Sequence, residues 1–397
     1  MKKRLLKRGV CLLMIICMVF TLAACSKKEE EKDELVMVWC SRDLNSEIGK
    51  KAQIILKHCV EEKNKNGGVN GAPVRVEFID GGTEQQAYLD ALLLALDVEG
   101  VDCIMGTAWS QFGIAASEYI EEAKIPVFNQ CTNEELANCN EYYYLPRGTN
   151  FGMTYSWAQI GIDEGITKAA VIYMNSSSGF NQCGYIKDHF EKNGLEVVAE
   201  IPFDTTNTND FTPHVLEAIN SGADGVFIIS NGDAQGVAIL TLLKEYNFPG
   251  VISGIAALMT PKFAALAGAE ACNGMVGYSE SDPYVDTPQN QEFLKTFYNE
   301  NGKMLENTDL TISWHDANFY DMFQMFCMAA EKEGANTPEA INAGLKKIDN
   351  YDGVMCNYSY NEDTAFANQM FIARYTGSET AEIEGTMPID HSWRPKK

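Results

Sequence analysis

The chain has 397 residues, of which 46% are apolar and 22% are charged, which is typical of a globular protein and excludes a disordered one. This length predicts two or three domains. The formal net charge is −24, and loss of the first 24 residues, which carry five basic and no acidic side chains, would make it −29. Nucleic acid is therefore not expected as a partner, because an acidic surface repels phosphate.

The amino terminus has the pattern of a secretory signal. Basic side chains between residues 2 and 8 precede an apolar run at 10–22, which is too short to span a bilayer comfortably. The run ends in Leu22-Ala-Ala-Cys25, which resembles a bacterial lipobox. That resemblance implies a signal peptide over 1–24, cleaved before Cys25, and a lipid on the Cys25 thiol. The alternative is an uncleaved membrane anchor, and both place the rest of the protein outside the cytoplasm. Residues 25–34 are rich in charge and are interpreted as a tether.

The cysteines do not indicate a metal or redox motif. Nine of the twelve follow Cys25, and none of these are spaced as a CxxC pair. The odd number argues against a complete disulfide framework, and one bridge between Cys131 and Cys139 stays open as an alternative.

Strands and helices alternate along the first part of the chain. Apolar runs predict strands at 35–39, 74–79, 102–105 and 125–128, and helical spacing predicts helices at 48–62, at 84–96 and after Ser110. Residues 142–150 are interpreted as a further strand and its exit. This alternation predicts an α/β fold with a doubly wound parallel sheet.

A second series of strands and helices follows. Helices are expected at 151–164, 180–193, 210–220 and 234–246, with strands at 169–173, 195–201, 225–229, 250–253 and 274–278. Residues 174–180 are interpreted as a polar loop. Helices at 289–300 and 310–331 come next, and the Met and aromatic stripe of the latter is most simply core. Another helix begins at Pro338 with Thr337 as its N-cap. Strands are expected at 354–358 and 369–373, and the tail from residue 377 is weakly patterned.

Two loops of the first series carry the candidate ligand site. Ser110 follows the strand at 102–105, and Thr132 follows the strand at 125–128. In an open parallel sheet, the loops that leave the carboxyl ends of strands line the ligand crevice. Each loop offers a hydroxyl group and backbone N–H groups near a helix start, which suits a small carboxylate. The alternative is that both residues only cap helices.

Several segments resemble the type I periplasmic binding proteins of the leucine-isoleucine-valine binding group. These are GGVNGAPVRVEFIDGGTEQQAY at 67–88, the strand and turn at 105–110, and IPVFNQCTNEEL at 125–136, and the resemblance extends from about residue 35 to the 370s. It implies two doubly wound parallel-sheet lobes joined by a three-crossing hinge. Lobe I would hold 35–150 and 282–350, and lobe II would hold 151–281 and 351–390. Closure of two lobes about a hinge suits the capture of a small molecule.

The resemblance also implies roles for individual residues. Trp109 and Ser110 in one loop, with Cys131 and Thr132 in the other, match family positions that hold the ligand carboxylate. Ser178 and Asn231 fall where lobe II closes over the ligand. Trp109 would be an aromatic wall, or alternatively a surface tryptophan packed on the following helix.

One departure from the family's pattern concerns the ligand ammonium. The amino-acid binders carry a carboxylate after the strand that matches 250–253, whereas this chain has Gly254-Ile-Ala-Ala257. An ammonium buried without a counter-charge is costly, so Asp233, Asp282 and Asp316 are candidates to replace that carboxylate. Asp316 is taken as the candidate ligand-binding residue. The ligand would be an amino acid, an amide, or a carboxylic acid without an ammonium group.

An enzyme is not expected. The chain has no Walker loop, no GxGxxG after a strand, no GxSxG and no HExxH, and His315 and Asp316 point in different directions on a helix. No cofactor and no metal are predicted. The resemblance implies a solute-binding lipoprotein of an ABC importer, anchored at the extracytoplasmic face of the cell membrane, which delivers its ligand to permease and ATPase subunits. The alternatives are a ligand-sensing module for a signalling receptor and an extracellular hydrolase.

Overall fold

The computed structural model describes residues 34–107, 109–206, 209–231, 233–281 and 287–393. The predicted signal peptide, Cys25 and most of the predicted tether lie outside the described residues. No helix within the described ranges combines the length and the apolar character needed to cross a bilayer.

The first large sheet is parallel throughout. It has the strand order β2-β1-β3-β4-β5. The strands are β1 (Leu35–Trp39), β2 (Val74–Phe78), β3 (Val101–Met105), β4 (Val127–Phe128) and β5 (Tyr143–Tyr144). The predicted parallel sheet is confirmed. Its central strands β1 and β3 are buried along their whole length, whereas the edge strand β2 is only partly buried.

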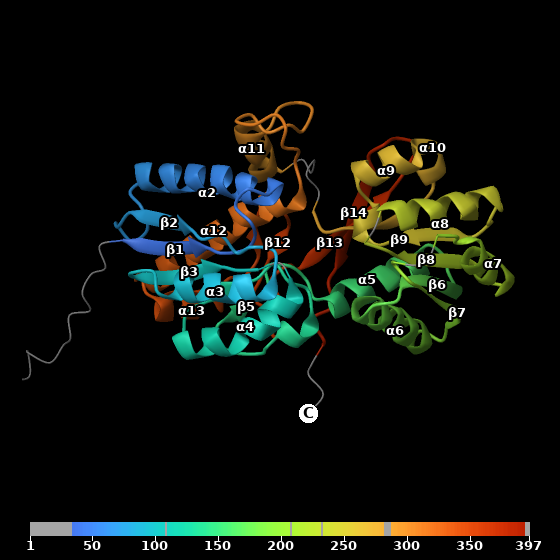
Figure 1. Ribbon diagram of the computed structural model, residues 1–397, viewed down its shortest axis with the longest axis horizontal. Helices are drawn as coiled ribbons and strands as arrows, with labels where there is room; N and C mark the ends of the chain where they lie inside the picture. Colours follow the sequence, from blue (N-terminus) through green and yellow to red (C-terminus); the bar gives the residue numbers. More distant parts are fainter. Residues whose placement is uncertain (1–33, 108, 207–208, 232, 282–286, 394–397) are drawn as a thin grey trace, which may run out of the picture. The chain divides into compact units, whose positions relative to one another are not determined.

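Alternating residues of the first sheet face two separate cores. Met37 and Met105 pack with α2 (Glu47–Lys65) and α12 (Trp314–Glu333), whereas Val38 and Ile104 pack with α3 (Gln85–Leu96) and α4 (Ser110–Ala123). Helices therefore cover both faces of this sheet (Figure 1). Helix α13 (Pro338–Leu345) packs on α12 so closely that a Cβ at Gly344 would lie 2.1 Å from the Ala329 carbonyl oxygen. The predicted Thr337 cap is confirmed, since its side chain accepts a hydrogen bond from Ala340 N.

The second large sheet has the order β14-β13-β10-β9-β8-β6-β7. Its parallel part consists of β6 (Lys168–Met174), β7 (Glu196–Phe203), β8 (Gly225–Ile229), β9 (Val251–Gly254) and β10 (Val276–Ser279). Strands β13 (Gln369–Arg374) and β14 (Glu382–Pro388) extend it in antiparallel fashion. In this part of the chain α5 (Asn150–Asp163) packs on α6 (Ser177–Lys192), and α7 (Thr212–Asn220) packs on α8 (Asp233–Glu245) (Figure 1).

Shorter elements complete the described chain. They are η1 (Glu134–Leu136), η2 (Ala256–Leu258), α9 (Pro261–Ala267), α10 (Ala269–Cys272), α11 (Pro288–Phe297), β11 (Tyr351–Asp352) and β12 (Asn357–Tyr358).

Several sequence-based boundaries were wrong. Helix α6 begins at Ser177 rather than 180, because the Ser176 side chain accepts a hydrogen bond from Gly179 N and starts the helix earlier. Helix α12 begins at Trp314 rather than 310, because Ser313 and Asp316 form a capping box. Strand β14 was missed, because Gly385 separates the two apolar residues of its inner face, Ile383 and Met387, and Pro388 ends the strand, so the alternating pattern is weak. Cys131 and Cys139 are free thiols, so the bridge between them is absent.

Three chain segments connect the two large sheets, as expected. Residues 145–149 lead from β5 to α5, residues 280–287 lead from β10 to α11, and residues 346–368 lead from α13 to β13. The first and third segments are hydrogen-bonded to each other, since Leu145 N donates to Thr364 O at 3.0 Å and Phe366 N donates to Leu145 O at 2.9 Å. These bonds make the segments a shared hinge rather than separate linkers.

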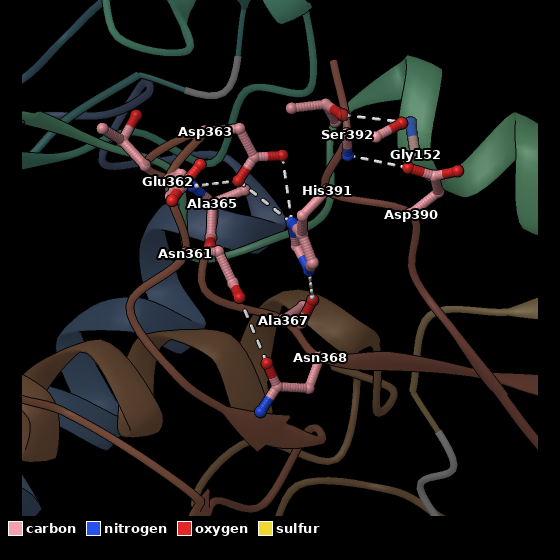
Figure 2. Close-up of polar contacts among 12 residues, drawn as sticks. Gly152, Asn361, Glu362, Asp363, Ala365, Ala367, Asn368, Asp390, His391 and Ser392 are labelled. Carbon is pink, nitrogen blue, oxygen red and sulfur yellow. Dashed lines mark hydrogen bonds and ion pairs between the residues drawn. The ribbon is translucent and has the colours of Figure 1, made fainter. Parts of the chain in front are cut away.

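His391, in the carboxyl-terminal segment, forms hydrogen bonds with Asp363 and Ala367 of this hinge. Figure 2 shows its ring between the Asp363 carboxylate, 3.0 Å from Nδ1, and the Ala367 carbonyl oxygen, 3.1 Å from Nε2. Asp363 is fully buried, so the imidazole is an important partner for its charge.

We expect His391→Ala to lower the free energy of unfolding by about 1–3 kcal/mol, because it removes a partner from a buried carboxylate. Urea denaturation followed by circular dichroism measures this. The matched control is Ser392→Ala, at an exposed neighbouring position where the backbone N–H, rather than the side chain, bonds to Asp390. Equal losses in the two variants would contradict the role given to His391.

Candidate functional site

The strand order points to the carboxyl ends of β1 and β3 as the place where a ligand would bind. From β1 the chain moves to β2 on one side, and it then returns to β3 on the other side of β1. In open α/β sheets, ligands bind at such a switch point, because the two exit loops diverge there. The β1 exit carries Ser41 and Arg42, and the β3 exit carries Thr107 and Trp109.

The second sheet has a corresponding switch point between β6 and β8. The chain moves from β6 to β7 on one side and then to β8 on the other. Ser178 lies after β6, half-buried in the first turn of α6, where its Oγ accepts a hydrogen bond from Gln182 Nε2 at 2.9 Å. Asn231 follows β8 and is exposed. Both predicted residues therefore lie at the same edge of this sheet.

Ser110 and Thr132 are not helix caps, so that alternative is wrong. Helix α4 has Trp109 at its N-cap position without a side-chain capping bond, and Ser110 is its first residue. The cap of η1 is Asn133, whose side chain accepts a hydrogen bond from Glu135 N at 2.7 Å. The first N–H groups of α4 thus have no side-chain cap, which suits an anionic ligand. Thr132 is half-buried beside this loop.

Cys131 has a packing role through its side chain. Its thiol is fully buried, contacts Thr107 O at 3.4 Å and is hydrogen-bonded to Ser110. Burial raises the pKa of Cys131 to about 12, so the thiol stays protonated at neutral pH. The contact with Cys131 links the Ser110 loop to the Thr132 loop.

Asp316 is engaged in holding the start of α12. Its carboxylate accepts a hydrogen bond from Tyr298 OH at 2.8 Å, and one oxygen lies 3.2 Å from Lys51 Nζ. It also closes the capping box with Ser313. Since these contacts occupy a fully buried carboxylate, the arrangement favours a structural role for Asp316 over contact with a ligand. The side chain of Asp233 and all of Asp282 lie outside the described residues.

Two arginines near the first switch point, Arg42 and Arg147, were not predicted as site residues from the sequence. The Arg42 guanidinium carbon lies 4.5 Å from the centre of the Trp109 ring, and that of Arg147 lies 4.2 Å from the Trp314 ring. Trp109 also packs on Phe112 of α4, with ring centres 5.0 Å apart. The signal was available in the sequence, because Ser41-Arg42 leaves a strand end just as Ser110 does.

The neutral form of His315 is favoured beside these arginines. Its ring stacks on Trp314 with centres 3.7 Å apart, and its buried Nε2 has no hydrogen-bond partner. Burial and the nearby cations Arg42, Arg147 and Lys51 hold the pKa of His315 well below its usual range. The positive charge near this ring therefore comes from Arg42, Arg147 and Lys51 and not from His315.

Arg147 connects the two sheets through Glu280, which follows β10. Its Nε donates to Glu280 Oε2 at 2.6 Å, its Nη2 pairs with the second carboxylate oxygen, and its Nη1 donates to Gln130 O at 2.9 Å. Further along, Glu134 of η1 accepts hydrogen bonds from Tyr185 and Asn181 of α6. The loops that follow the first-sheet strands thus contact elements of the second sheet.

Within the described part of the chain, no group of three or more His, Cys, Asp or Glu residues could hold a metal ion.

Comparisons with known proteins agree with this architecture. Residues 45–380 match the family model described as "Periplasmic binding protein". The chain is 26% identical over 325 residues to Leu/Ile/Val-binding protein homolog 8 of Brucella abortus, which covers 77% of this chain and 78% of that protein.

Solved structures share the fold. One is a branched chain amino acid ABC transporter periplasmic ligand-binding protein from Burkholderia xenovorans, with a TM-score of 0.77, 19% identity, and coverage of 92% of this chain and 97% of that one. Another is an ABC transporter substrate-binding protein from Desulfitobacterium hafniense in complex with Leu, with a TM-score of 0.70, 18% identity, and coverage of 88% and 99%. A third is a solute-binding protein from R. palustris in complex with benzoate, with a TM-score of 0.70, 15% identity, and coverage of 91% and 98%. With its two α/β sheets, its three connecting segments and a family match over most of its length, the chain belongs to the periplasmic binding protein family.

Proposed function

We propose that this protein is the extracytoplasmic solute-binding lipoprotein of an ABC importer. It captures an amino acid, or a related small carboxylate or amide, between its two lobes and delivers it to the permease and ATPase subunits. Lobe I consists of 35–150 and 282–350, and lobe II consists of 151–281 and 351–390. One observation supports the proposal above all. In a chain of this family, polar loops follow the strands at the switch points of both sheets, which is where open α/β sheets bind ligands.

The ligand carboxylate binds the hydroxyl and backbone groups of the first-sheet loops. Ser110 and Thr132 supply hydroxyl groups, the uncapped start of α4 supplies N–H donors, and the Cys131 backbone lies between the two loops. Trp109 forms an aromatic wall. Ser178 and Asn231 contact the ligand from the second sheet. The two lobes close about the hinge and bury the solute between them.

A thermal-shift screen over amino acids, amides and organic acids tests this function. A ligand at 100 times its dissociation constant stabilises the native state by about 2.7 kcal/mol, so a true ligand raises the melting temperature measurably. We expect hits to be confined to small molecules that carry a carboxylate or an amide. A screen in which no compound raises the melting temperature would count against solute binding, and chemical turnover of a hit would point to an enzyme.

We expect Cys25→Ala to abolish lipid attachment, because the thiol of Cys25 is the acceptor in the lipobox-like sequence. Incorporation of labelled palmitate in cells measures this, and the variant should also lose its association with membranes. Cys40→Ala is the matched control, since Cys40 is fully buried in the folded chain and should leave labelling unchanged. Continued labelling of Cys25→Ala would contradict the proposed anchor.

A further inference from the structure

The two arginines at the first switch point differ in how their charges are balanced. Arg147 is neutralised by the two-point contact with Glu280. Arg42 forms no ion pair and no side-chain hydrogen bond within the part of the chain that the structure describes, and its Nε is buried without a partner. One positive charge therefore stands at the β1 exit without a counter-charge from the described residues.

This unpaired charge is unfavourable for the ligand-free protein. Burial lowers the pKa of Arg42, and the charge of the neighbouring Arg147 lowers it further. A half-buried cation without a partner weakens the fold unless something else supplies the opposite charge. An unpaired charge that lowers stability is characteristic of functional sites, where a bound ligand supplies the opposite charge. Ser41, next to Arg42, is fully buried and its Oγ also has no hydrogen-bond partner.

Two carboxylates beside the arginines are paired with cations. Glu280 pairs with Arg147 and Asp316 pairs with Lys51, so neither acid is left over for a ligand ammonium. Arg42, Arg147 and Lys51 together with Glu280 and Asp316 therefore sum to one excess positive charge, which a zwitterionic amino acid does not neutralise. Glu134 is not part of these ion pairs, because it accepts hydrogen bonds from the uncharged side chains of Tyr185 and Asn181 on α6, and its buried Oε2 has no partner among the described residues.

We propose that Arg42 binds the ligand carboxylate and that the site selects small organic acids with a net negative charge over zwitterionic amino acids. The Trp109 ring lies against the guanidinium in a cation–π contact, which leaves the edge donors of the guanidinium available to pair with a carboxylate. This inference rests on the proposed function, because it takes the β1/β3 switch point as the solute site.

Titration calorimetry with matched ligand pairs tests the charge selection on the full-length protein in detergent. The pairs are 4-methylpentanoate and leucine, 3-phenylpropanoate and phenylalanine, and glutamate and glutamine, whose members share a carbon skeleton and differ in net charge. We expect the anionic member of a binding pair to bind about tenfold or more tightly, because the zwitterion or amide leaves a charge uncompensated. Equal or tighter binding of the net-neutral member overturns the proposal.

Binding by no member of any pair also overturns the charge selection. The thermal-shift screen then separates the two levels of inference. Hits among net-neutral amino acids or amides would reject the role of Arg42 while keeping the solute-binding function, whereas no hit at all would reject both.

Variants at two arginines separate a binding role from a structural one. R42Q should weaken binding of the anionic ligand roughly 30-fold or more, and R42K should restore part of the affinity because it keeps the charge. The matched control is R75Q, since Arg75 lies on β2 and is paired with Glu34 and Glu77. It should leave the affinity unchanged.

The melting temperature without ligand gives a second readout. R42Q should melt at the same temperature as the unchanged protein or higher, because an unpaired charge has been removed. A lower melting temperature for R42Q with unchanged affinity would show that Arg42 is a structural residue, and it would overturn the proposal.

Discussion

Replacing Lys51 by methionine should destabilise the protein by about 3–5 kcal/mol, because it leaves a buried carboxylate without its cation. Lys51 lies on α2 with only 1% of its side chain exposed, and its ammonium is 3.2 Å from the buried Asp316 carboxylate. The same ammonium donates to Thr311 O and to Ser313 Oγ, both at 2.8 Å. This one group therefore fastens the start of α12 to α2.

Chemical denaturation measures the loss, with Lys50→Met as the matched control at an adjacent exposed position. The control should change the stability by no more than about 0.5 kcal/mol. The double variant Lys51→Met with Asp316→Asn should recover part of the loss, because it removes both charges. A loss below about 1 kcal/mol in Lys51→Met would contradict the importance of this pair.

The deficit of Lys51→Met should shrink in acid. Burial raises the pKa of Asp316 above its ordinary value of 3.8, and Lys51 opposes this rise. Without Lys51 the folded protein holds the proton more tightly than the unfolded chain, so this group stabilises the fold at low pH and the stabilisation is lost as the pH rises through the folded pKa. Unfolding curves from pH 4 to pH 7 measure this, and a deficit that grows in acid would contradict it.

Asp321→Ala should cost about 3–5 kcal/mol, because three donors lose their acceptor at once. Asp321 of α12 is fully buried, and it accepts hydrogen bonds from Val354 N and Met355 N at 2.7 Å and from Tyr358 OH at 2.8 Å. Two of these donors are backbone groups of the third connecting segment. The carboxylate therefore fixes the path of the chain between α13 and β13.

Calorimetric or denaturant unfolding measures the loss, and Asp352→Ala is the matched control in the same segment. Asp352 is exposed and accepts one hydrogen bond, from Asn357 Nδ2 at 2.7 Å. We expect the control to lose less than about 1 kcal/mol. Asp321→Asn should fall between the two, because an amide keeps one acceptor oxygen but turns an NH2 group toward a donor. Equal losses in Asp321→Ala and Asp352→Ala would contradict the account of this hinge segment.

The sequence predicted the strands of both sheets well, because a strand buried on two faces is a short apolar run with little ambiguity. It predicted helix starts less well. Ser176 and Ser313 are the N-cap residues that set the starts of α6 and α12. Each lies among several polar residues that could also cap a helix, so the sequence alone does not identify the N-cap. Strand β14 was missed because, among the described strands, it pairs with β13 alone, and because Gly385 interrupts the apolar face formed by Ile383 and Met387.

The sequence predicted the position of only part of the candidate site. Ser110 and Thr132 were predicted from strand exits, and Ser178 and Asn231 from the family resemblance, and all four lie after strand ends in the structure. Arg42 also leaves a strand end, but it was missed because a charged residue after a strand is usually a solvated one. In the structure its guanidinium lies against the Trp109 ring. The partners of Asp316 and Arg147 lie far away in the chain, at Lys51 and Glu280, so no spacing rule could identify them.

The central claim is that this protein holds a small carboxylate at the switch points of its two sheets. Mass spectrometry of the molecule released by denaturing the freshly purified, tag-free protein tests it most directly. We predict a single small organic acid in near-stoichiometric amount, absent when R42Q is purified in the same way. Protein that retains nothing and binds none of the screened solutes would contradict the claim, as would a retained ligand that carries no carboxylate.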